Sequence, residues 1–206
     1  MSKVVTYVLA LFVIVAGSYF VLSYNDAPES PSARTFESEQ YGFSLEYPEG
    51  WQWSSSNDFQ VAFNAFIPPP EGTKPPFIHH HNVTNVSIFP DGVPTEGLIG
   101  EMRPVAFDVP FEIEERSLMF VLEDGTPFAA YIRPANPPDS WGESGFIWVR
   151  AHLDEISTRC FDPDGNEVSE ATCDPLGGNV TVRWSGRLEP KEWNEVMRVL
   201  GSLVLE

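Results

Sequence analysis

Cys160 and Cys173 are the only two cysteines of the chain, and twelve residues lie between them. In a domain outside the cytoplasm, which the N-terminal segment described below indicates, such a pair predicts a disulfide. Closing a loop of this size stabilises the folded state by roughly 3 kcal/mol in the chain-entropy model. A redox pair is the alternative, but it normally requires closer spacing and a thiolate of lowered pKa. The spacing therefore favours a structural crosslink.

Oxygen-bearing side chains at Asp162, Asp164 and Asn166 occupy alternate positions inside this loop. They resemble the first half of a calcium loop, in which hard oxygen ligands converge on the ion. The pattern then departs from such a loop, because the glycine comes too early and Cys173 stands where a bidentate glutamate belongs. A type I turn accounts for the same residues. A calcium- or small-ligand-binding module that uses the Cys160–Cys173 loop remains an alternative function, and no other cofactor is predicted.

Three consecutive histidines run from His79 to His81. Neighbouring side chains of an extended chain point to opposite sides, so only His79 and His81 could share a metal ion. A catalytic zinc site needs three protein ligands and a structural one needs four. The run therefore predicts an exposed loop, in which His79 and His81 bind a metal only if other residues complete the site.

A serine between glycines, Ser144 in the stretch Gly142–Phe146, is the nearest approach to an enzyme motif. Together with His152 it would define a serine hydrolase, which is a further alternative function. A nucleophile elbow, however, requires a glycine two residues after the serine, where this chain has Phe146. A turn before a strand explains the same residues, and we predict that the chain is not an enzyme.

Short alternating apolar segments separated by turn residues must position these side chains, and they predict a sheet-rich domain. A tight hairpin is expected at Glu123-Asp124-Gly125, where glycine can adopt the positive φ of the turn. The strands that we predict are Phe43–Tyr47, Gln52–Ser54, Gln60–Phe66, Asn82–Phe89, Ser117–Leu122, Phe128–Arg133, Phe146–His152 and Asn179–Trp184.

One helix is predicted over Pro190–Leu200. Proline suits its first position, Glu192 and Arg198 match the helix dipole at its two ends, and Gly201 can end it. Its apolar stripe has helical spacing, which indicates packing on a sheet and not a cofactor platform. A shorter helix is expected around Pro94 to Arg103, although its two glycines weaken it.

The N-terminal segment contains 21 uncharged residues from Val4 to Tyr24, enough to span the hydrocarbon of a bilayer at 1.5 Å per residue. Lys3 precedes it and acidic residues follow it, so the positive-inside rule places the remaining chain outside the cytoplasm. A cleaved signal peptide is the alternative, with small residues at Ala16 and Ser18. We predict a transmembrane anchor over residues 1–24, a flexible linker over 25–34 and an extracytoplasmic domain over 35–206.

Acidic side chains dominate the charge of the chain. Thirty Asp and Glu residues face twelve Lys and Arg residues, which gives a formal net charge of -18. This field repels phosphate backbones, so we predict no nucleic-acid partner.

The block Tyr41-Gly42-Phe43-Ser44-Leu45-Glu46-Tyr47-Pro48 followed by Gly50-Trp51 resembles the opening of PsbP-like domains, the family of the extrinsic photosystem II protein and its bacterial relatives. The helix from Pro190 and a short closing strand after it agree with this family. The resemblance implies an α+β fold, in which an antiparallel sheet is flanked by helices as an α/β/α sandwich. It also implies non-enzymatic proteins that bind partners outside the cytoplasm. The function that we predict is a single-pass, membrane-tethered accessory or binding domain with a protein partner still to be identified.

Overall fold

The computed structural model describes residues 32–56, 60–66, 83–92, 99–169, 172–174 and 180–206. Residues Ala33–Glu206 form one compact unit, and its first strand, β1 (Ala33–Ser38), includes the last two residues of the predicted linker. No helix within these described ranges has the length and hydropathy that a membrane span requires. The predicted anchor, residues 1–24, lies outside them.

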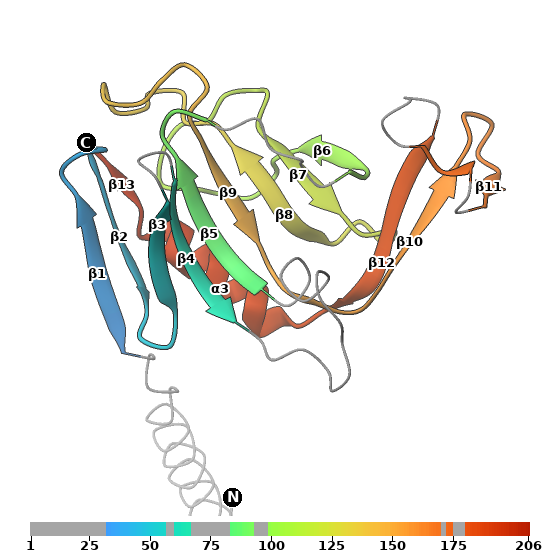
Figure 1. Ribbon diagram of the computed structural model, residues 1–206, viewed down its shortest axis with the longest axis horizontal. Coiled ribbons are helices and arrows are strands. Elements are labelled where there is room, and N and C mark those ends of the chain that lie inside the picture. Colours follow the sequence, from blue (N-terminus) through green and yellow to red (C-terminus); the bar gives the residue numbers. More distant parts are fainter. Residues whose placement is uncertain (1–31, 57–59, 67–82, 93–98, 170–171, 175–179) are drawn as a thin grey trace, which may run out of the picture. The chain divides into compact units, whose positions relative to one another are not determined.

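A seven-stranded antiparallel sheet, here called the central sheet, is the largest element of the fold (Figure 1). Its register pairs Val86 with Phe63 on one side and with Val149 on the other, so apolar side chains of neighbouring strands share one face. In spatial order its strands are β3 (Gln52–Ser56), β4 (Gln60–Phe66), β5 (Val83–Phe89), β9 (Phe146–Arg150), β8 (Pro127–Ile132), β7 (Leu118–Val121) and β6 (Met102–Pro104).

Helix α3 (Pro190–Gly201) packs on one face of the central sheet, against β5 and β9. A three-stranded sheet, here called the terminal sheet, packs with it and has the order β1-β2-β13, with β2 at Phe43–Pro48 and β13 at Val204–Leu205. The main core fills the space between these elements. Its fully buried members include Phe43, Leu45, Phe63, Val86, Ile147, Val149, Val196 and Leu200.

The block that resembles PsbP-like domains has the local structure that its residues predict. Gly42 has a φ of +61°, which permits the turn into β2. Phe43, Leu45 and Tyr47 are all buried on one face of β2, and Trp51 folds back onto α3, where its indole nitrogen donates to Glu195 at 3.1 Å. These residues therefore anchor the terminal sheet in the main core.

The expected α/β/α sandwich, however, is wrong. Among the described residues α3 is the single α-helix, and thirteen strands in three antiparallel sheets make the fold mostly β. The described strands between Leu153 and Leu188 form a third sheet instead of a second helical layer. This outer sheet has the order β11-β10-β12, with β10 at Leu153–Phe161, β11 at Glu167–Val168 and β12 at Thr181–Leu188.

A second core joins the outer sheet to the end of the central sheet. Phe120 and Phe128 of the central sheet are fully buried, and Phe128 lies 5.9 Å from Trp184 of β12 between ring centroids. Strand therefore packs on strand here. β12 supplies Val182 and Trp184 at alternate positions, and β10 supplies Leu153 and Cys160 from the two sides of its register shift.

The segment of residues 105–113, here called the strap, connects β6 to the residues before β7 and contacts α3. Alternate apolar residues of the strap pack on the main core, and Phe107 meets Trp193 of α3 edge-on at 5.5 Å. The short helix predicted over 94–103 is wrong in its described part, since Met102–Pro104 form strand β6 and residues 93–98 lie outside the described ranges.

Other sequence predictions are confirmed. All eight predicted strands correspond to strands of the structure, and α3 begins at the predicted Pro190. The hairpin at 123–125 closes with a hydrogen bond from the Gly125 nitrogen to the Leu122 oxygen at 2.8 Å, and Gly125 has a φ of +88°. The turn signal and the predicted start of the helix therefore hold, whereas Gly201 is the last residue of α3 and Ser202, not a glycine, caps its end.

Candidate functional site

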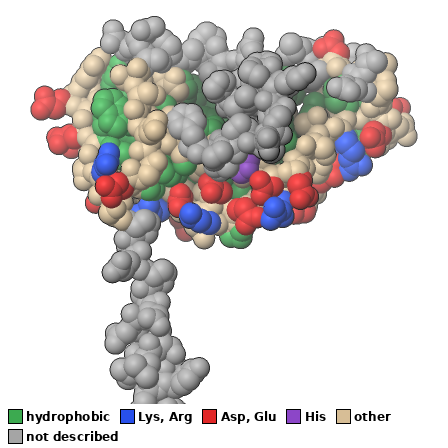
Figure 2. All heavy atoms as spheres, turned by 60° about the horizontal axis from the view of Figure 1, so that its bottom comes forward, with side chains coloured by type: hydrophobic (Ala, Val, Ile, Leu, Met, Phe, Trp, Pro, Cys, Tyr) green, Lys and Arg blue, Asp and Glu red, His purple; other side chains and the backbone are tan. Residues whose placement is uncertain are grey.

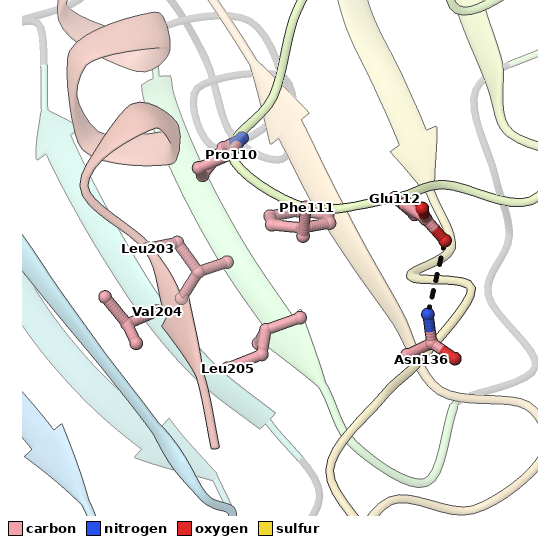
Figure 3. A pocket seen from close by; sticks show the side chains of 7 residues that line it. All are labelled: Pro110, Phe111, Glu112, Asn136, Leu203, Val204 and Leu205. Atoms are coloured by element: carbon pink, nitrogen blue, oxygen red, sulfur yellow. Dashed lines mark hydrogen bonds between the residues drawn. The ribbon is translucent and has the colours of Figure 1, made fainter.

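A groove of about 290 Å³ lies between β13 and the end of the strap. Figure 3 shows Leu203 and Leu205 pointing toward Phe111, with Glu112 and Asn136 at the other end. The complete lining is Pro110, Phe111, Glu112, Asn136, Leu203, Val204 and Leu205. One wall is therefore apolar and the opposite end is polar.

The register of β13 decides which backbone groups face this groove. Leu205 lies opposite Phe43 in β2, and the next residue, Glu206, donates its backbone N–H to the Gly42 oxygen at 2.9 Å. In an antiparallel pair, hydrogen-bonded and non-hydrogen-bonded positions alternate. The N–H and C=O of Leu205 therefore point away from β2, toward the open edge of the terminal sheet.

The last turn of α3 fixes the position of β13. The Ser202 hydroxyl accepts the Glu46 N–H at 2.8 Å and donates its proton to the Val199 oxygen at 2.7 Å, with the Glu46 oxygen at 3.1 Å as the other acceptor. It thus links the end of α3 to β2, and Leu203 beside it is buried in the main core. Strand β13 is therefore fixed at one end by Ser202 and at the other by the hydrogen bond from Glu206 to Gly42, so its outer edge has a defined position before any ligand binds.

Polar groups of the groove are few. Asn136 donates its side-chain N–H to Glu112 at 3.4 Å, and both residues are exposed. Val204 exposes 53% of its surface. Apolar contact, backbone hydrogen bonds and a carboxylate are the interactions that this site can offer a ligand.

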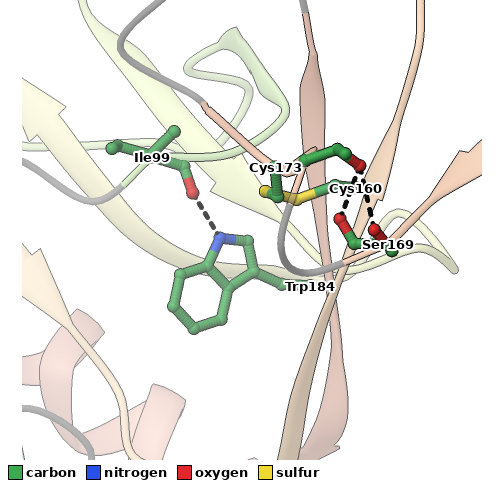
Figure 4. The surroundings of a disulfide bond; sticks show 6 residues. Ile99, Cys160, Ser169, Cys173 and Trp184 are labelled. Carbon is green, nitrogen blue, oxygen red and sulfur yellow. Dashed lines mark hydrogen bonds between the residues drawn. A yellow bond between two sulfur atoms is a disulfide. The ribbon is translucent and has the colours of Figure 1, made fainter.

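Cys160 and Cys173 are joined by the predicted disulfide, with their Cα atoms 5.8 Å apart (Figure 4). A hollow of about 360 Å³ beside it is lined by residues of β10, β11 and the Cys173 segment. Its wall carries the Arg159 guanidinium, which forms ion pairs with Glu123 and Glu167. These ion pairs engage both carboxylates, so neither Glu123 nor Glu167 could bind a calcium ion without giving up its contact with Arg159.

The residues Asp162 and Asn166 come together in the β10–β11 hairpin. The Asp162 carboxylate accepts the Asn166 backbone N–H at 2.8 Å and its side-chain N–H at 3.1 Å. Asn166 thus turns its side-chain N–H toward Asp162. A cation shared by the two residues would require the side-chain oxygen of Asn166 in that position. Asp164 is exposed at the tip, and the described residues contain no group of three or more His, Cys, Asp or Glu arranged to hold a metal. These contacts describe a closed turn.

These hydrogen bonds lower the pKa of Asp162 below its usual value, the Asn166 backbone N–H being the largest cause. A carboxylate whose pKa is lowered by folding stabilises the fold above its unfolded pKa, and this contribution disappears as the pH falls through the folded value. We expect Asp162→Ala to reduce the stability at pH 7 and to cost progressively less below about pH 4. Urea unfolding at pH 7 and below about pH 4 measures the stability cost of Asp162→Ala, with Asp164→Ala as the control that removes the same charge. A cost that does not depend on pH would contradict the stabilising role of the Asp162 carboxylate.

The other predicted site residues do not assemble. His79 and His81 lie outside the described residues. Ser144 precedes β9 and His152 follows it, and this five-residue strand alone spans roughly 13 Å between its first and last Cα atoms at 3.3 Å per residue, so it keeps the two residues apart. A Cβ at Gly145 would lie 2.5 Å from the Pro90 oxygen, so close loop packing accounts for the glycine beside Ser144.

His152 instead belongs to a polar network at the start of α3. Its backbone N–H donates to the fully buried Thr84 hydroxyl at 3.0 Å, and that hydroxyl donates to the Glu192 carboxylate. Its ring Nε2 lies 3.0 Å from Asp154, which also accepts from Arg187 at 2.9 Å. Figure 2 shows acidic and basic side chains gathered along this side of the domain. The network connects β5, β10, β12 and α3.

Sequence reasoning missed the groove. The strap carries a signal that could have located one wall, since Val105, Phe107, Val109, Phe111 and Ile113 alternate strictly with other residues. The opposite wall depends on the pairing of β13 with β2, which no local pattern reveals.

The chain matches no protein-family model, no curated protein and no solved structure. The resemblance of residues 41–51 to PsbP-like domains therefore stays a prediction, and the fold that it implied is corrected above.

Proposed function

We propose that this chain is a membrane-tethered accessory domain that acts outside the cytoplasm by binding a protein partner. The observation that carries this proposal is the groove beside the open edge of β13, because unpaired backbone groups next to apolar side chains suit a polypeptide. A disulfide supports an oxidising compartment, and the 21-residue apolar segment at the N-terminus supports a tether.

Photo-crosslinking in the native membrane tests this function. A photoreactive amino acid replaces Val204 at the groove in one variant and Asp164 at the hairpin tip in a matched control; both positions are exposed. We expect the Val204 position to crosslink to one protein that the Asp164 position does not capture. Equal capture at the two positions, or none at Val204, would contradict a binding role for the groove.

The compartment has its own test. Protease added to intact, osmotically stabilised cells is expected to degrade the domain beyond residue 32 and to leave cytoplasmic proteins intact. Protection of the domain until the membrane is permeabilised would overturn the extracytoplasmic assignment.

A further inference from the structure

We propose that the groove binds an extended, positively charged segment of the partner protein, which pairs with β13 as an additional strand of the terminal sheet. This inference rests on the proposed function and specifies the kind of partner and its binding mode. In the described part of the chain β13 has β2 as its one strand neighbour, so its outer edge is open.

Backbone geometry supports strand addition. The N–H and C=O of Leu205 point away from β2, side by side at the spacing that another extended backbone matches. An added strand would direct alternate side chains to one face of the sheet, where Leu205 and Phe111 provide an apolar surface. A hydrogen-bonding edge and an adjacent apolar pocket are the two parts of β-strand recognition.

Charge selects the partner. Glu112 lines the groove, Glu206 directly follows β13, and the whole chain carries -18. A second copy of the chain would bring the same charge to the same edge, and the two copies would repel each other. A segment that alternates Lys or Arg with aliphatic residues satisfies the edge, the apolar wall and the acidic rim together.

A defined peptide tests the binding mode on the full 206-residue chain in detergent micelles. The probe is a fluorescein-labelled hexapeptide of alternating lysine and leucine. One analogue is methylated on its leucine nitrogens and another on its lysine nitrogens, so both retain the charge and the side chains of the parent. Only one edge of an added strand faces β13, so we expect one analogue to bind at least about tenfold more weakly than the parent and the other to bind equally well. Equal binding of all three peptides would show simple charge attraction and would overturn strand addition.

Matched variants of Leu205 provide the second measurement. Leu205→Pro removes the outward N–H without removing a hydrogen bond to β2, because prolines are tolerated at the open side of an edge strand. Leu205→Ala keeps the N–H and shortens the side chain. We expect Leu205→Pro to weaken binding of the parent peptide about tenfold and Leu205→Ala to weaken it less. The reverse order, or no binding of the peptide to the wild-type chain, would refute the inference.

Hydrogen exchange of a ¹⁵N-leucine-labelled chain gives a readout at the site itself. The Leu205 amide is expected to exchange rapidly in the free chain and more slowly when the parent peptide is bound. An unchanged Leu205 rate with saturating peptide would place the peptide elsewhere. If these tests fail while the Val204 crosslink to a protein persists, strand addition is wrong and the binding function stands; if the crosslink also fails, both are wrong.

Discussion

Replacing Thr84 with valine is expected to lower the free energy of unfolding by about 3 kcal/mol, because it leaves two polar groups of the network without their partner. The Thr84 hydroxyl is fully buried, accepts the His152 backbone N–H at 3.0 Å and donates to the Glu192 carboxylate. Valine has nearly the same shape and can make neither bond. Both lost contacts join separate elements, since Thr84 lies in β5, His152 precedes β10 and Glu192 lies in α3.

Urea denaturation measures this effect, and two control variants isolate its cause. Thr84→Ser keeps the hydroxyl and should retain most of the stability that Thr84→Val loses. Thr181→Val makes the same chemical change at an exposed position of β12 and is expected to change stability by less than about 0.5 kcal/mol. A loss for Thr84→Ser as large as that for Thr84→Val would contradict the hydrogen-bonding role, because serine keeps the hydroxyl and loses only the methyl group.

Local signals in the sequence predicted the elements that depend on local physics. Strand β4 has the predicted bounds, Gln60–Phe66, because apolar residues and turn signals define both ends. Helix α3 begins at Pro190 for a similar reason, since proline and Glu192 suit a first turn. The disulfide followed from spacing and the expected compartment.

Strand β10 and the groove depend on contacts between segments that are far apart in the sequence, so local patterns did not predict them. Strand β10 was missed because its charged residues and its register shift leave no regular apolar alternation, although Leu153 and Cys160 are buried and the strand pairs with β12. That long pairing is also why a second layer of helices is absent from the described domain. The groove has the same origin, because it requires β13 to pair with β2 and the strap to lie beside it, and these segments are far apart in sequence.

Removing the disulfide is expected to lower the free energy of unfolding by roughly 3 kcal/mol, the entropy of closing a loop of this length in the unfolded chain. The bond joins Cys160 in β10 to Cys173, and Cys160 is buried in the second core. A Cys160→Ala/Cys173→Ala variant keeps two small side chains in these positions and removes only the crosslink and two sulfur atoms. Thermal and urea unfolding of this variant measure the loss at pH 7.

Peptide binding by the variant without the disulfide tests whether the crosslink acts on the unfolded chain or on the structure of the groove. If the disulfide acts mainly on the unfolded chain, its removal lowers the stability of the whole domain but leaves the β13 groove intact, because the groove belongs to the main core and the crosslink to the second core. We therefore expect the double variant, at a temperature where it is folded, to bind the lysine–leucine peptide with the same affinity as the wild-type chain. Reducing the disulfide of the wild-type chain should lower its stability as much as the double substitution does. The same reductant should not change the stability of the variant. Loss of peptide binding by a folded variant would instead mean that the crosslink maintains the structure of the binding edge.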